Sequence, residues 1–189
     1  MIAILASFLI STNATPRQIV ESCRTMIPRD IVLEGRIILR NRKGIPQLEK
    51  DYVLTRAAGK TALAVGGEEQ KPAAPSENIL GTDVTWSDLT LDYLWWDDFA
   101  VGGEGVSESV QGQACVTIDL KKGERTVRVW VDRKTGALMQ AEELKDGKTV
   151  RRLWGTRIKK FGDRWMANVM EVETLGSGHR TKITVEKLK

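Results

Sequence analysis

The fold is decided by the stretch from Gln113 to Lys189, which reads QACVTIDLKKGERTVRVWVDRKTGALMQAEELKDGKTVRRLWGTRIKKFGDRWMANVMEVETLGSGHRTKITVEKLK. It divides into short segments separated by glycine-bearing turns, such as Lys122-Gly123-Glu124 and Asp146-Gly147-Lys148. This spacing, with no helical interlude, predicts an antiparallel meander. The six predicted strands are Gln113–Leu120, Thr126–Asp132, Leu138–Leu144, Thr149–Ile158, Arg164–Glu173 and His179–Leu188.

The composition is that of a globular protein, with 189 residues of which 41% are hydrophobic and 29% charged. We expect one domain with a substantial core, and wholesale disorder is excluded. Residues 71–120 carry one Lys or Arg against nine Asp or Glu, whereas residues 121–189 carry eighteen against nine. The basic part either attracts the acidic part within the fold or meets an anionic partner such as a lipid headgroup.

The first fourteen residues differ from the rest of the chain. Ile2 to Ile10 is an apolar run too short to span a bilayer, and Thr12-Asn13-Ala14 supplies small residues at a cleavage position. We predict that residues 1–14 are a signal peptide and that the protein is exported to the periplasm. No Lys or Arg precedes the apolar run, so a buried strand is an alternative reading.

The two cysteines, Cys23 and Cys115, allow two interpretations. In an exported protein they fit a single disulfide, and otherwise they are two buried thiols. Polar residues precede Cys23, which argues against a lipid-attachment cysteine.

The first half of the chain predicts a helix followed by strands. Thr15-Pro16-Arg17-Gln18 carries the signals of a helix start, and an apolar stripe follows as far as Pro28. Residues 31–40, 48–56 and 61–65 read as strands, and residues 66–78 read as a flexible loop.

Bulky aromatic residues mark a second predicted helix, which Asp83 or Thr85 could cap. Trp86, Leu89, Tyr93 and Trp96 recur at helical spacing and would form one face. Such a stripe is either core or part of a ligand site.

Two strands of the meander carry apolar side chains on both faces, which requires a second cover or an apolar cavity. Met166 and Met170 share one of these faces and would suit either an adaptable cavity lining or ordinary core filling.

The sequence lacks the common catalytic patterns. It has one histidine, His179, predicted near a turn on an edge strand, and it lacks a nucleophile elbow, a phosphate loop and a dinucleotide fingerprint. We therefore expect no metal site, no cofactor and no enzymatic activity.

The stretch Gly81-Thr82-Asp83-Val84-Thr85-Trp86-Ser87-Asp88-Leu89 resembles a pattern found in bacterial outer-membrane lipoprotein-sorting proteins of the LolA-like superfamily. The likeness continues through Val129-Trp130-Val131-Asp132, Gly136-Ala137-Leu138 and Gly162-Asp163-Arg164-Trp165-Met166, and it covers residues 15–189. A departure is Trp86, where the family usually has Tyr.

The resemblance implies an α+β fold, in which an open antiparallel half-barrel, a curved meander sheet, has helices across its concave face. It also implies an apolar cavity for lipid acyl chains, closed by a lid. The expected ligand residues are Trp86, Leu89, Tyr93, Trp96, Met166 and Met170.

We therefore predict a periplasmic carrier that passes lipoprotein acyl chains, or another lipid, from an inner-membrane donor to an outer-membrane acceptor. An envelope-stress sensor on the same fold is one alternative. Another is a basic nucleic-acid-binding protein, although no nucleic-acid partner is expected of an exported chain. Its footprint would be Lys121, Lys122, Arg125, Arg128, Arg151, Arg152, Lys159 and Lys160.

Overall fold

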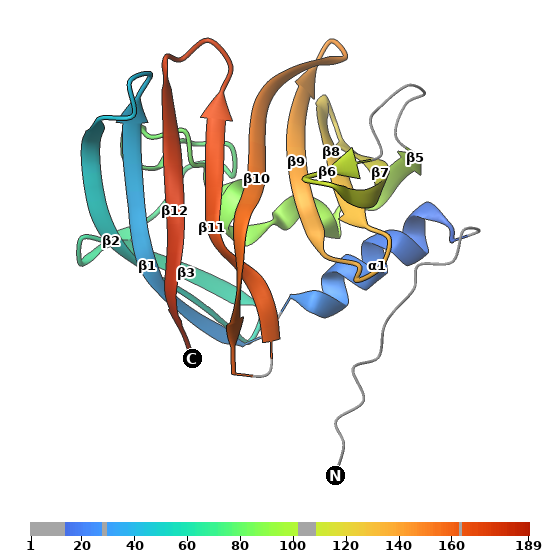
Figure 1. Ribbon diagram of the computed structural model, residues 1–189, viewed down its shortest axis with the longest axis horizontal. Helices are drawn as coiled ribbons and strands as arrows, with labels where there is room; N and C mark the ends of the chain where they lie inside the picture. Colours follow the sequence, from blue (N-terminus) through green and yellow to red (C-terminus); the bar gives the residue numbers. More distant parts are fainter. Residues whose placement is uncertain (1–13, 28–29, 102–108, 163) are drawn as a thin grey trace. The chain divides into compact units, whose positions relative to one another are not determined.

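The computed structural model (Figure 1) describes residues 14–27, 30–101, 109–162 and 164–189. The predicted signal peptide falls almost wholly outside these ranges. The chain divides into two compact units, each discontinuous in sequence. Unit 1 comprises Met1–Ile27 and Tyr93–Leu144, and unit 2 comprises Pro28–Asp92 and Lys145–Lys189.

Unit 1 is a small antiparallel sheet with one helix. Its strands pair in the order β5-β7-β8-β9, and β6 pairs with the start of β7. Its elements are α1 (Pro16–Met26), the 3-10 turn η2 (Asp92–Trp95), β5 (Asp98–Val101), β6 (Ser109–Val110), β7 (Gln113–Lys122), β8 (Arg125–Asp132) and β9 (Leu138–Lys145).

The central strands of unit 1 are buried on both faces, although the sequence predicted apolar side chains on both faces only for the strands that became β10 and β11. Along β7, Ile118 and Leu120 are fully buried on one face and Cys115 on the other. Cys115 packs in a cluster with Val110, Trp130 and Met139. That side of the sheet also carries polar groups, and Arg128 donates two hydrogen bonds to the carboxylate of Asp119 on the opposite strand.

Helix α1 begins as predicted, with a capping box between Thr15 and Gln18 and with Pro16 in the first turn. Its Cys23 thiol donates to the carbonyl of Gly136 at 3.2 Å, in the turn between β8 and β9. A side chain at Gly136 would lie 3.1 Å from the hydroxyl of Ser22, and its φ of +76° disfavours other residues. Glycine is therefore required where the turn meets the helix.

Unit 2 is an antiparallel sheet with strand order β4-β3-β2-β1-β12-β11-β10. Its two halves join where β1 pairs with β12, the last strand of the chain (Figure 1). Its elements are β1 (Ile31–Asn41), β2 (Pro46–Ala57), β3 (Lys60–Val65), β4 (Glu68–Gln70), the 3-10 turn η1 (Ile79–Gly81), α2 (Trp86–Thr90), β10 (Lys148–Phe161), β11 (Arg164–Thr174) and β12 (His179–Leu188).

One face of this sheet carries most of the buried apolar side chains of unit 2, and we call it the covered face. The strand registers place its side chains on the same side, because directly opposed residues of antiparallel strands share a face. All are less than 9% exposed, and they are Leu63, Val65, Tyr52, Leu54, Ile37, Ile183, Val185, Val172 and Leu153.

All six predicted meander strands and the three early strands are present, and each end lies within three residues of its predicted position. The fold is therefore an antiparallel sheet with few helices, as predicted. No helix among the described residues has the length and apolar character needed to cross a membrane.

Three predictions are wrong. Residues 68–70 form strand β4 against β3, inside the predicted loop, because the turn at Gly66-Gly67 returns the chain. His179 is not on an edge strand, because β12 has β1 on one side and β11 on the other. The predicted aromatic helix is broken: α2 ends at Thr90, Leu91 turns left-handed with φ 54°, and η2 follows.

Candidate functional site

Residues 79–90, which contain η1 and α2, lie across the covered face of unit 2, and we call them the cover segment. Their side-chain contacts reach β10, β11 and β12 through Asp83 and Asp88. At the other end, Arg56 of β2 donates to the Thr90 carbonyl at 2.6 Å. The segment is therefore attached to both halves of the sheet.

Asp83 anchors the middle of the cover segment through a fully buried carboxylate. Its Oδ1 accepts from the backbone N–H of Thr174 at 3.1 Å. Its Oδ2 accepts from the Thr181 hydroxyl at 3.1 Å and lies 2.8 Å from Nδ1 of His179. The Asp83 N–H in turn donates to the Thr181 hydroxyl, so this buried charge is well supplied with partners.

Asp88 performs two tasks with one oxygen. It accepts from the N–H and the hydroxyl of Thr85, which completes the capping box of α2. The same oxygen accepts from Arg151 of β10, whose guanidinium also donates to the Asp83 carbonyl at 2.7 Å. The side chains of Asp88 and Arg151 are only 7% and 14% exposed, so this pair fixes the short helix to the sheet.

The sequence motif that carried the family resemblance is thus the cover segment. The sequence predicted Asp83 as part of that motif and as a helix cap, and Asp88 as part of the motif. Their partner Arg151 was predicted only as part of the basic footprint. Nothing near Arg151 in the sequence distinguishes it from its neighbour Arg152, because the pairing is long-range.

Of the six predicted ligand residues, the four expected on one helix do not share one, because the helix is broken after Thr90. In unit 2, Leu89 is buried in the cover segment and Trp86 is half-buried. Met170 lies on the covered face of β11 and is half-buried. Met166 is also half-buried on β11, but the register shifts between the two methionines. Ala167 lies beside Gly155, the partner of Met170, so Met166 faces the other side of the sheet.

The other two predicted ligand residues are core of unit 1. Tyr93 and Trp96 are 2% and 3% exposed and meet edge to face, with ring centroids 6.5 Å apart. The guanidinium of Arg125 lies over the Trp96 ring at 5.1 Å. Arg24 of α1 donates to the Leu94 carbonyl at 2.7 Å and to that of Trp96 at 3.4 Å, which ties this stretch to the helix.

Some arginines of the predicted basic footprint form ion pairs within the protein. Arg128 is paired with Asp119, Arg151 with Asp88, and Arg125 with Glu143. Three of the eight proposed contacts to nucleic acid are therefore already neutralised within their own units.

The disulfide alternative is not realised, because both cysteines are buried free thiols. Each has its own carbonyl acceptor, Gly136 for Cys23 and Gln113 for Cys115. Burial raises the pKa of both thiols, that of Cys23 to about 12. Among the residues placed in the structure, no three His, Cys, Asp or Glu side chains are grouped to hold a metal ion.

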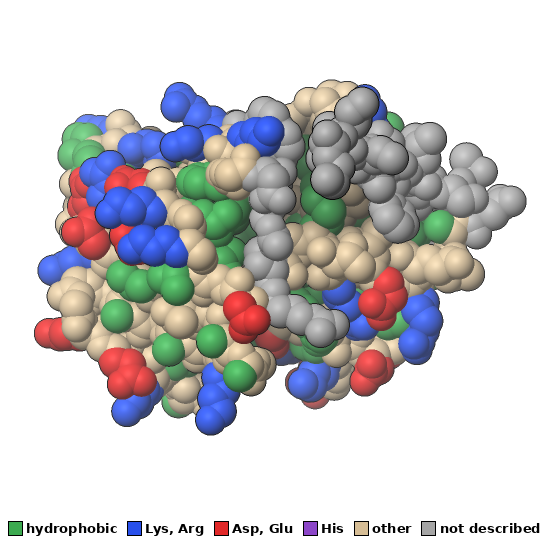
Figure 2. All heavy atoms as spheres, turned by 90° about the horizontal axis from the view of Figure 1, so that it is seen from below, with side chains coloured by type: hydrophobic (Ala, Val, Ile, Leu, Met, Phe, Trp, Pro, Cys, Tyr) green, Lys and Arg blue, Asp and Glu red, His purple; other side chains and the backbone are tan. Residues whose placement is uncertain are grey.

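Apolar side chains also reach the surface, where Figure 2 shows them in separate patches among charged groups. Among the described residues, the large apolar side chains that are more than 40% exposed are Met26, Ile45, Val53, Leu80, Trp95 and Leu175.

Comparison with known proteins agrees with this architecture. Residues 69–189 match the model of a family described as "Uncharacterized protein". No curated protein matches the sequence.

Three solved structures resemble the chain over nearly its whole length. A LolA superfamily protein from Nitrosomonas europaea is 14% identical, covers 93% of both chains and has a TM-score of 0.70. A DUF1329 family protein from Desulfovibrio piger is 16% identical with a TM-score of 0.67, covering 93% of this chain and 92% of that one. A putative outer membrane lipoprotein-sorting protein domain from Vibrio parahaemolyticus is 14% identical with a TM-score of 0.66, covering 93% and 91%.

Proposed function

This chain belongs to the family whose model matches residues 69–189, its fold is LolA-like, and we propose that it carries lipid acyl chains in the bacterial envelope. The cargo would be the acyl chains of lipoproteins or of another lipid. A donor at the inner membrane and an acceptor at the outer membrane would be its partners, and residues 1–14 would direct its export to the periplasm.

The observation that carries this proposal is the covered face of unit 2. The cover segment touches β11 at Thr174, and Met170 follows four residues along the same strand. At the usual rise of a strand it lies about 13 Å further on. Met170 is half-buried on a face where most apolar side chains are fully buried, so a flexible apolar side chain is available to a ligand there.

An acyl chain suits such a surface, because each buried methylene contributes about 0.8 kcal/mol without any polar partner. Affinity should therefore increase with chain length and depend little on the headgroup. Trp86, half-buried in the cover segment, would join Met170 at the chain. Leu89, which is buried in the cover segment, would contact it only if that segment moves as a lid.

The test measures uptake of a fluorescent fatty acid and its displacement by fatty acids of increasing length. Met170→Asp and Trp86→Asp should each weaken binding about tenfold or more, since a charge would face the acyl chain. Val53→Asp is the matched control, because Val53 is 42% exposed on the opposite face of the same sheet and should tolerate the change.

Circular dichroism must show that each variant remains folded. The proposal fails if the wild type takes up no fatty acid of any length, or if Met170→Asp binds as well as Val53→Asp. Export is tested separately: protein from native cells should begin near Thr15 and fractionate with the periplasm.

A further inference from the structure

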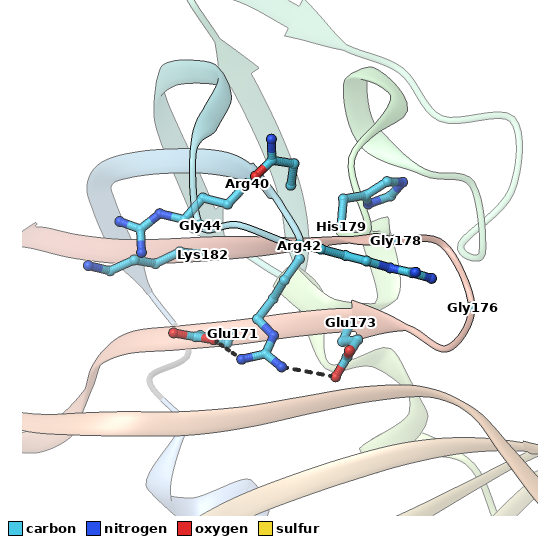
Figure 3. Close-up of a pocket in the computed structure, with 11 residues that line it drawn as sticks. Arg40, Arg42, Gly44, Glu171, Glu173, Gly176, Gly178, His179 and Lys182 are labelled. Atoms are coloured by element: carbon cyan, nitrogen blue, oxygen red, sulfur yellow. Dashed lines mark hydrogen bonds and ion pairs between the residues drawn. The ribbon is translucent and has the colours of Figure 1, made fainter.

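A polar pocket of about 360 Å³ lies in unit 2, beside the turns that join β1 to β2 and β11 to β12 (Figure 3). Its lining includes three glycines of these turns, Gly44, Gly176 and Gly178, which leave the backbone accessible. Its charged side chains are Arg40, Arg42, Arg180, Lys182, Glu171 and Glu173. Four cations thus face two carboxylates.

Two of the cations oppose each other directly. Arg40 of β1 is the register partner of Arg180 of β12, and like charges in this position destabilise a sheet. Lys182 lies two residues along from Arg180, on the same face. All three project from the face opposite the cover segment.

The carboxylates neutralise only part of this charge. Arg180 donates to Glu171 at 3.1 Å and to Glu173 at 3.3 Å, so both carboxylates are engaged by one guanidinium. That guanidinium also lies 5.0 Å from the centre of the Trp154 ring, which holds it in place.

Arg40 is left with an unused donor. Its Nε is buried and has no hydrogen-bond partner among the described residues. Buried donors almost always have an acceptor, so an unpaired N–H inside a cationic pocket indicates a site for a ligand oxygen. Within the same described part of the chain, no carboxylate pairs with Arg40, Arg42 or Lys182.

We propose that this pocket binds a phosphate group, held by Arg40 and Lys182 with Arg42 at the rim. Guanidinium groups present a planar set of donors that matches phosphate oxygens, and the excess of positive charge favours a dianion or a phosphodiester. The site is on the opposite face of the sheet from the acyl-chain surface and does not depend on it. The phosphate comes either from solution or from the headgroup of an anionic phospholipid.

The experiment has two arms that distinguish these sources. In the first, inorganic phosphate is titrated calorimetrically into the full-length chain at low ionic strength, with chloride at equal ionic strength as the reference. In the second, binding is measured to vesicles of phosphatidylcholine alone and to vesicles that also contain phosphatidylglycerol. Phosphate binding in the first arm assigns a soluble ligand, and binding only to the anionic vesicles assigns the headgroup.

Arg40→Gln and Lys182→Gln should each weaken the observed binding about tenfold or more, because each removes a charged hydrogen-bond donor. Arg36→Gln is the matched control. Arg36 lies on the same face of β1, but its guanidinium is already paired with Glu49 and Glu186 at 2.6 and 2.7 Å. Its loss removes the same formal charge and should leave binding unchanged.

Three results would overturn the proposal. The wild type could bind neither phosphate nor anionic vesicles. Arg36→Gln could weaken binding as much as Arg40→Gln, which would assign the effect to general surface charge. Arg40→Gln and Lys182→Gln could both leave binding unchanged. If Arg40→Gln fails to fold, Lys182→Gln decides alone, and uptake of fatty acid by that variant should match the wild type.

Discussion

The two units attach their covering elements in different ways. In unit 2, the cover segment is fixed by the buried charges of Asp83, Asp88 and Arg151. In unit 1, α1 is held by the buried Ile19 and Val20, by the Cys23 thiol and by Arg24 on backbone carbonyls.

The difference indicates which of the two covering elements is held in a single position. Apolar contacts are non-directional and tolerate small displacements, whereas a buried carboxylate keeps its favourable energy only while every partner stays in place. The cover segment should therefore hold one position as long as its charges are paired, and α1 should adjust more readily to changes beneath it.

The substitution with the largest expected effect on the attachment of the cover segment is Asp83→Ala. The substitution leaves Thr174 N–H, Thr181 and His179 without their common acceptor, and we expect it to lower the free energy of unfolding by about 3–5 kcal/mol. Urea denaturation measures it. Asp51→Ala, at an exposed position of the same sheet, should stay within about 0.5 kcal/mol of the wild type. Equal effects at the two positions would contradict the anchoring role.

Arg151→Met should cost about 2–3 kcal/mol, because it removes the charged donor that joins α2 to β10. A double-mutant cycle with Asp88→Ala isolates the pair, and we expect a coupling energy of about 1–3 kcal/mol. Additive effects would show that the two side chains contribute independently.

In unit 1, Gly136→Ala should cost about 2 kcal/mol, because the new methyl group meets both a positive φ and Ser22 of α1. Gly147→Ala is its control: φ is +72° but no atom lies within 4 Å, so only the backbone cost of about 1 kcal/mol remains. The difference between their thermal unfolding free energies measures the helix contact, and no difference would exclude it.

The smallest effect concerns the Cys23 thiol, whose pKa burial raises from 9.0 to about 12. The folded state holds this proton more tightly, so the contribution to stability is complete below pH 9 and is lost as the pH rises toward 12. The stability advantage of the wild type over Cys23→Ala should therefore shrink by about 1 kcal/mol between pH 8 and pH 10. Ile19→Val in the same helix has no titrating group, and its difference from the wild type should stay constant across this range. A constant difference for Cys23→Ala as well would place the thiol in contact with water.

Local signals in the sequence were sufficient for most of the sheet. Glycine turns and alternation predicted the strands, and hydroxyl residues predicted the caps of both helices, because each of these effects acts within a few residues. The same local reading failed at Leu91, since a leucine rarely adopts positive φ and only the surrounding contacts hold it there.

The candidate site was less predictable because its contacts are long-range. Asp83 meets Thr174, His179 and Thr181 across more than 90 residues of chain, and Arg151 meets Asp88 across 63. The helical spacing of Trp86, Leu89, Tyr93 and Trp96 was a real pattern in the sequence. The break at Leu91 nevertheless assigns the first two residues to unit 2 and the last two to unit 1.

The pairing of β1 with β12 has a consequence for how the chain folds. Val32 and Lys189 exchange two backbone hydrogen bonds, so strands near opposite ends of the sequence must meet before the sheet of unit 2 is continuous. Contacts of such separation in sequence slow folding, because a long loop must be closed before they form. Since β12 follows every other strand of the unit in the sequence, β1 emerges from the ribosome long before its partner β12. The sheet of unit 2 therefore cannot be completed before β12 has been synthesised.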